Sequence, residues 1–193
     1  MPANEEVSKR LEGNLWSRLG LIATLRDGRT PTEQRRLLLK WAMKDAPASR
    51  PGSRFAYSNH GYALAGLMAE QVTGQSWETL MKHRLFPLGM SSAGFGQPGR
   101  PGEVDQPWGH LRSRDQVKPT QANFPPIVGP AATVHCSIPD WSKFAVLHLA
   151  AAQGKAKLLK PSTFRALQTP RTGLGYACGW EVLDNYPRPA AAL

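Results

Sequence analysis

The sequence predicts a predominantly helical protein with a few antiparallel strands. Helix start and stop signals recur through residues 1–93 and return after residue 136. Between these parts, residues 94–136 are rich in glycine and proline and are expected to form a loop with one hairpin. Beyond that hairpin, only residues 176–183 alternate between apolar and polar side chains well enough to favour a strand.

The first predicted helix begins at a capping box in residues 30–33. There the threonine hydroxyl accepts from the glutamate N–H, the glutamate returns the bond, and proline occupies the first helical position. Leu37, Leu38 and Trp41 then form one apolar stripe. The helix should end near Asp45, because a proline follows two residues later.

Two further helices follow in the same half of the chain. One is expected from Asn59 to Gly74, since glycine is favourable just beyond a helix end. It carries the apolar residues Leu64, Leu67, Met68 and Val72. Ser76 is a favourable N-cap for the next helix, residues 77–86.

The later elements are marked by similar signals. In the glycine-rich and proline-rich part, residues 108–111 are expected to pair with residues 117–120. A second capping box, residues 137–140, opens a helix that Gly154 ends. Trp141 and Phe144 lie three residues apart on this helix and are expected in the core. A short helix over 161–168 and a strand over 176–183 complete the predicted elements.

The chain is basic, with 24 Lys and Arg against 14 Asp and Glu. Such a balance fits an anionic partner, but the basic residues occur as singles and pairs such as Arg35-Arg36, with no tract of five or more. We therefore expect a solvated basic surface and no nucleic-acid partner; a basic nucleic-acid binder is the weaker alternative.

Neither a membrane span nor a signal peptide is predicted. No stretch approaches the roughly 20 apolar residues of a span, and residues 1–6 carry acids where a signal peptide needs positive charge. From these residues alone we expect a cytoplasmic protein. If the N-terminus is truncated, we expect a periplasmic or secreted protein.

Metal and cofactor sites are not expected. Cys136 and Cys178 form no C-x-x-C motif, although a disulfide between them stays open, and the five histidines have no ligand spacing. Residues 94–99 satisfy G-x-G-x-x-G but follow no clear strand and open no helix. Residues 89–93 resemble a nucleophile elbow without its last glycine and are interpreted as a turn.

Several segments in a fixed order point to a family. They are Pro51-Gly52, Phe55-Ala56-Tyr57-Ser58-Asn59, Gly61-Tyr62, Val72-Thr73-Gly74, Leu85-Phe86-Pro87-Leu88-Gly89-Met90, Gly129-Pro130-Ala131 and Asp140-Trp141. Together they resemble the class C β-lactamase-related serine hydrolases, which include class C β-lactamases, D-alanyl-D-alanine carboxypeptidases and family VIII esterases. The resemblance covers nearly the whole chain.

This resemblance implies that residues 1–193 form a single partial domain. It would be the helical portion of the α/β β-lactamase/transpeptidase-like fold, with an incomplete main sheet. The family's Ser-x-x-Lys nucleophile motif and its His-x-Gly or Lys-Thr-Gly strand do not occur in the 193 residues. We expect a small-molecule ester, β-lactam or peptide substrate for the complete enzyme, and an inactive isolated chain. A non-catalytic binding module of the same fold is the alternative.

The resemblance also assigns roles to two residues. Tyr57 would be catalytic, taking a proton from the nucleophilic serine and returning it to the leaving group. A tyrosine with an ordinary pKa of about 10 is a poor base at neutral pH. In the family, the lysine of Ser-x-x-Lys lowers the pKa of this tyrosine. Without that lysine we expect Tyr57 to stay protonated. Asn59 would bind the substrate amide, and its place before a helix also makes it a candidate N-cap.

Overall fold

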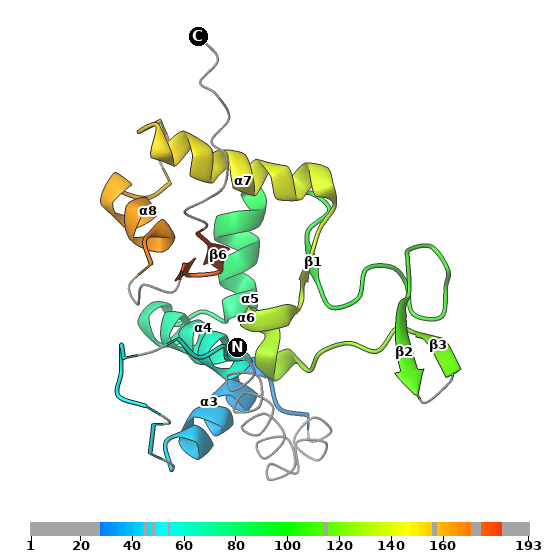
Figure 1. Cartoon of the computed structure of the whole chain (residues 1–193). Coiled ribbons are helices and arrows are strands. Elements are labelled where there is room, and N and C mark those ends of the chain that lie inside the picture. Colours follow the sequence, from blue (N-terminus) through cyan, green and yellow to red (C-terminus); the bar gives the residue numbers. More distant parts are fainter. Residues whose placement is uncertain are drawn as a thin grey trace. The chain divides into compact units, whose positions relative to one another are not determined.

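The computed structural model describes residues 28–182, except residues 45, 48, 54, 114, 115, 156, 157 and 171–174 (Figure 1). Helices dominate this part of the chain, and its strands form three two-stranded antiparallel pairs. The predicted fold class, predominantly helical with a few antiparallel strands, is therefore confirmed. The chain divides into two compact units, Met1–Ala46 with Ala56–Lys143 and Pro47–Phe55 with Phe144–Leu193.

Helix α3, Pro31–Ala42, begins at the predicted capping box. The Thr30 hydroxyl accepts from the Glu33 N–H at 3.3 Å, and the Glu33 carboxylate accepts from the Thr30 N–H at 2.7 Å. The helix ends three residues before Asp45, where its end was predicted; Asp45 itself lies outside the described residues.

Helix α4, Asn59–Thr73, ends as predicted at Gly74, which has a left-handed φ of 68°. Of the four apolar residues named from the sequence, Leu67 is buried, whereas Met68 and Val72 are 69% and 88% exposed. The buried residues of α4 are Ala63, Gly66, Leu67 and Glu70. A Cβ at Gly66 would lie 2.3 Å from the Pro130 side chain. Small residues thus allow a close helix contact on that face.

The predicted third helix is a continuous helical run of three kinds. It consists of α5, Trp77–Leu80, a π-helical segment, Met81–Leu85, and a 3₁₀ turn, Phe86–Leu88. Ser76 caps it as predicted, with its hydroxyl accepting from the Thr79 N–H at 3.1 Å.

The predicted hairpin is confirmed as β2, Gly109–Ser113, paired with β3, Gln116–Thr120 (Figure 1). The loop around it holds further elements that the sequence did not predict. These are β1, Gly94–Phe95, which pairs with β4, Val134–His135, the 3₁₀ turn Pro126–Val128, and α6, Gly129–Ala132. The turn supplies Ile127 and Val128 to a core cluster with Leu38 and Ala63.

Helix α7, Ile138–Ala152, starts where its capping box predicted, but the box is only half formed. The Ser137 hydroxyl accepts from the Asp140 N–H at 3.4 Å. The Asp140 carboxylate instead accepts from the Ser92 hydroxyl at 2.6 Å and from the Lys143 ammonium at 2.6 Å. The aspartate therefore ties the turn before β1 to the first turn of α7.

The predicted strand over residues 176–183 is wrong as a single strand. Residues Tyr176–Ala177 form β5 and Trp180–Glu181 form β6, paired as a tight hairpin. Cys178 and Gly179 have φ of 46° and 96°, and positive φ at both positions makes a two-residue turn that reverses the chain. Residue 183 lies outside the described residues.

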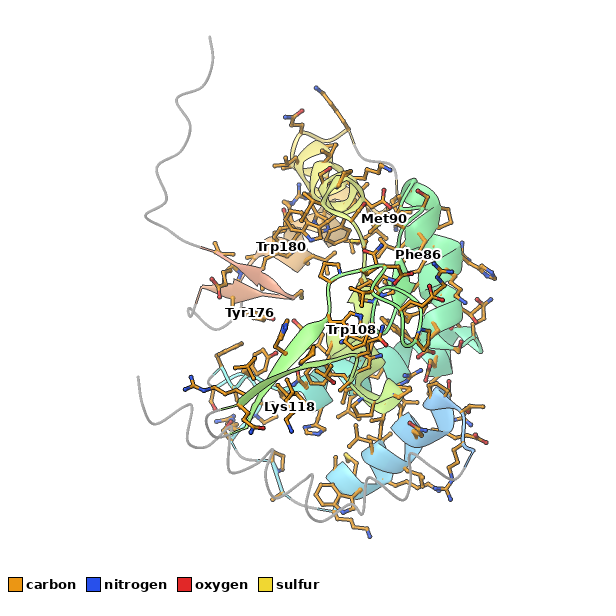
Figure 2. The ribbon with its side chains drawn as sticks, turned by 90° about the vertical axis from the view of Figure 1, so that its right-hand side faces the viewer. Phe86, Met90, Trp108, Lys118, Tyr176 and Trp180 are labelled. Carbon is orange, nitrogen blue, oxygen red and sulfur yellow. The ribbon has the colours of Figure 1, made fainter. Side chains whose placement is uncertain are left out.

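The core of the second unit surrounds His148, which is 5% exposed. Its ring contacts those of Phe144 on α7, Phe164 on α8, Pro161–Gln168, and Trp180 on β6. Of these residues, Trp180 is labelled in Figure 2. Burial lowers the pKa of His148. The predicted helix over 161–168 is confirmed, whereas Trp141, predicted in the core, is 53% exposed.

Among the residues that the structure describes, no helix is long and apolar enough to cross a membrane.

Candidate functional site

Tyr57 and Asn59 lie together at the start of α4. The Tyr57 hydroxyl donates to the Asn59 side-chain oxygen, Oδ1, at 3.1 Å. Tyr57 is 56% exposed, and Asn59 is half-buried. The phenolic oxygen keeps lone pairs that can accept a proton, and the Asn59 amide nitrogen keeps its two N–H donors.

Ser58, not Asn59, is the N-cap of α4, so the predicted cap is wrong. The Ser58 backbone is extended, with φ −156° and ψ 114°, and its hydroxyl accepts from the Gly61 N–H at 3.1 Å. Asn59 is the first helical residue. Because the serine satisfies the helix terminus, the asparagine side chain is free to bond with Tyr57.

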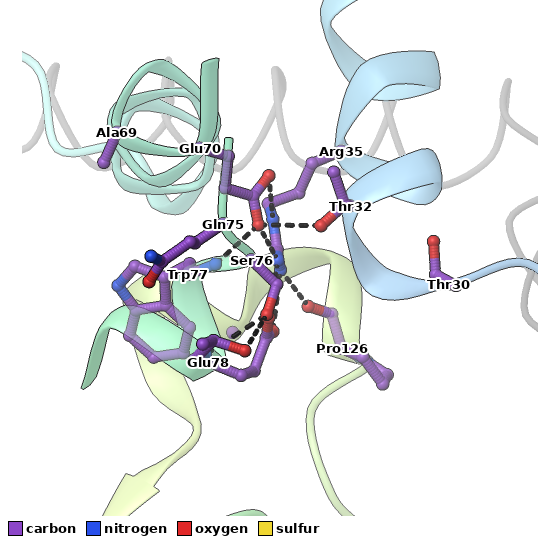
Figure 3. Close-up of polar contacts among 12 residues, drawn as sticks. Thr30, Thr32, Arg35, Ala69, Glu70, Gln75, Ser76, Trp77, Glu78 and Pro126 are labelled. Atoms are coloured by element: carbon purple, nitrogen blue, oxygen red, sulfur yellow. Dashed lines mark hydrogen bonds and ion pairs between the residues drawn. The ribbon is translucent and has the colours of Figure 1, made fainter. Parts of the chain in front are cut away.

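A second polar cluster, which sequence reasoning missed, centres on Arg35 (Figure 3). Arg35 of α3 is fully buried, with two glutamates as ion-pair partners. Its Nη1 donates to Glu78 at 3.1 Å and to the Pro126 carbonyl at 3.0 Å. Its Nη2 donates to Glu78 at 2.9 Å and to Glu70 at 2.5 Å, and its Nε donates to Glu70 at 3.4 Å. All five N–H groups of the guanidinium are thereby bound.

Glu70 receives further donors from two other elements. The Thr32 hydroxyl donates to it at 2.9 Å and the Trp77 N–H at 2.8 Å. Burial opposes the charged form, but the hydrogen bonds from Arg35, Trp77 and Thr32 outweigh it and lower the pKa of Glu70. Glu70 is therefore ionised at neutral pH.

The Arg35 cluster holds the helices of the first unit together. It joins α3, α4, α5 and the 3₁₀ turn Pro126–Val128, and so fixes the helix that begins at Asn59, two residues after Tyr57. The sequence interpretation placed Arg35-Arg36 on a solvated surface; this holds for Arg36, which is exposed, and is wrong for Arg35. The available signal was the spacing of Arg35 and Leu38, which puts both on one helix face.

Within residues 28–182, apart from the undescribed positions, no group of three or more His, Cys, Asp or Glu side chains is placed to hold a metal ion.

Known proteins resemble the chain in sequence. A family model described as beta-lactamase matches residues 17–187. Penicillin-binding protein 4 of Amycolatopsis lactamdurans is 28% identical over 150 residues, which cover 69% of this chain and 39% of that protein. The chain thus spans about two fifths of the curated relative's length.

Solved structures resemble it in fold. A D-stereospecific amidohydrolase from Streptomyces sp. matches with a TM-score of 0.57 and 25% identity, over 78% of this chain and 43% of its own. The octameric penicillin-binding protein homologue from Pyrococcus abyssi matches with a TM-score of 0.58 and 23% identity, over 75% of this chain and 32% of that protein. The helical arrangement is therefore shared with proteins considerably longer than this chain.

Proposed function

This chain belongs to the β-lactamase-related serine hydrolase family, and we propose that Tyr57 and Asn59 form one wall of its substrate site. The family is one of β-lactamase-like hydrolases, and the chain shares the β-lactamase/transpeptidase-like fold. The proposed substrates are small acyl compounds: an ester, a β-lactam or a peptide amide. One relative is named for penicillin binding and one for D-stereospecific amide hydrolysis, which supports this class.

The observation that carries the proposal is the hydrogen bond between Tyr57 and Asn59 at the start of α4. In acyl transfer, a group beside the nucleophile must take its proton and then protonate the leaving group. The Tyr57 hydroxyl has the chemistry to carry that proton. The Asn59 amide N–H groups, not used by Tyr57, would donate to a carbonyl of the substrate.

We further propose that the 193 residues by themselves bind such a compound without turning it over. They contain no Ser-x-x-Lys, so within them Tyr57 has no paired nucleophile to serve. The isolated chain would then act as a binding module of the same fold.

Hydrolysis and binding assays test this proposal together. We expect no turnover of nitrocefin or p-nitrophenyl acetate, and measurable binding of a penicillin or an aryl boronate by isothermal titration calorimetry. Tyr57→Phe should weaken that binding by roughly threefold to tenfold, the usual effect of one lost hydrogen bond. Tyr176→Phe, which removes a hydroxyl from the second unit, is the matched control.

Two outcomes would contradict the proposal. Turnover abolished by Tyr57→Phe would show that a working site exists in these residues. An absence of binding, or equal binding by the two tyrosine variants, would remove Tyr57 from the site.

A further inference from the structure

We infer that Ser58 is a positioning residue: by capping α4 it holds Tyr57 and Asn59 on one side of the chain. The inference rests on the proposed function of these two residues. Ser58 itself faces away from them, since its hydroxyl accepts from the Gly61 N–H at 3.1 Å. It would act through its neighbours without touching the substrate.

The extended backbone at Ser58 brings its two neighbours together. In extended chain, successive side chains point to opposite sides, so residues two apart share a side. With φ −156° and ψ 114° at Ser58, Tyr57 and Asn59 are such a pair. Their side chains meet in the 3.1 Å hydrogen bond.

A helical backbone at Ser58 would separate the pair. Each residue of an α-helix turns the chain by about 100°, so residues two apart point about 200° from each other. The Tyr57 hydroxyl would then face away from the Asn59 amide. Whether α4 begins after or before Ser58 therefore decides whether the pair forms.

The serine hydroxyl sets this boundary. Serine is a strong N-cap, whereas alanine is a poor cap and the best interior helix former. Replacing Ser58 by alanine should therefore let the helix extend back towards Tyr57.

The test compares cap-removing and cap-keeping variants of the full chain. Ser58→Ala removes the cap, and Ser58→Thr and Ser58→Asn keep one. Ser76→Ala is the matched control, because Ser76 caps α5 by the same bond, its hydroxyl accepting from the Thr79 N–H at 3.1 Å. The readouts are the ¹³C-tyrosine NMR signal of Tyr57, assigned with Tyr57→Phe, the thermal unfolding midpoint, and binding of an aryl boronate.

We expect both alanine variants to lower the unfolding midpoint, but only Ser58→Ala to shift the Tyr57 signal and weaken boronate binding by roughly threefold to tenfold. Ser58→Thr and Ser58→Asn should restore the Tyr57 signal and the boronate binding. An unchanged Tyr57 signal in Ser58→Ala, or an equal shift in Ser76→Ala, would overturn the inference. If the wild type binds no boronate, the proposed function fails, while the NMR comparison still decides whether Ser58 positions Tyr57.

Discussion

At the scale of single residues, Arg35 shows how a charge is tolerated inside a small protein. A buried guanidinium loses its hydration, and only well-aligned partners offset that cost. Here two carboxylates and one carbonyl meet the five donors of its planar fork, as in the close-up of Figure 3. The match depends on the shape of the side chain as well as its charge.

Arg35→Lys tests that dependence. A lysine ammonium is a point charge with three donors, and it cannot reach Glu70, Glu78 and the Pro126 carbonyl in the same geometry. We expect the free energy of unfolding to fall by about 2–4 kcal/mol, below the cost of removing the charge entirely. Urea unfolding followed by tryptophan fluorescence measures it. Arg36→Lys, on the exposed neighbour, should stay within about 0.5 kcal/mol, and equal effects of the two variants would refute the buried role.

Asp140 gives the chain a defined acid sensitivity. Hydrogen bonds from Lys143 and Ser92 lower the pKa of Asp140 from 3.8 to about 2. A carboxyl with a lowered pKa contributes stability that is present above its ordinary value and is lost as pH falls through the folded value. We therefore expect the unfolding midpoint to drop between pH 3.8 and about 2. Asp140→Asn should flatten that drop, and Glu103→Gln, at an exposed carboxylate, should leave it unchanged.

At the scale of elements, helix α4 shows how one glycine permits a close contact between two helices. Gly66 lets α6 approach so closely that a Cβ there would meet Pro130 at 2.3 Å. A Cβ at Gly61, on the same helix, would lie 3.6 Å from the Ser58 side chain, which is an ordinary contact distance. The two glycines thus differ in what surrounds them.

Alanine at each glycine should have opposite effects. Gly66→Ala forces α4 and α6 apart and should cost about 1–3 kcal/mol. Gly61→Ala gains helix propensity without a clash and should stabilise the chain by about 0.5 kcal/mol. Thermal unfolding followed by circular dichroism at 222 nm compares them. Stabilisation by both variants would show that the α4–α6 contact yields easily.

The same elements explain which parts of the fold could be predicted from the sequence. Caps at Thr30, Ser76 and Gly74 act within a few residues, so the helix ends they set were predicted. The turn at Cys178-Gly179 was missed, because cysteine in a left-handed conformation is not a turn signal and the flanking residues alternate. The one-turn helix α6 was missed because proline and glycine dominate its neighbourhood.

At the scale of the whole molecule, one part of the candidate site could be predicted from the sequence and another part could not. Tyr57 and Asn59 were identified from a local motif, and their contact needs only the backbone between them. The burial of Arg35 depends on Glu70 and Glu78, which lie 35 and 43 residues further along the chain. No pattern within one helix predicts such distant partners. The cluster that fixes α4 could therefore be found only in the folded structure.

The two compact units should respond separately to core damage. Leu38 and Phe164, each 2% exposed, lie in different units: Leu38 packs with Ala63, Ile127 and Val128, and Phe164 packs against His148. Leu38→Ala and Phe164→Ala each remove a buried side chain and should cost about 2–5 kcal/mol locally. Because local opening follows local packing, hydrogen exchange measured by mass spectrometry should rise within the unit that carries the substitution. Equal acceleration in both units by either variant would show that they unfold as one cooperative body.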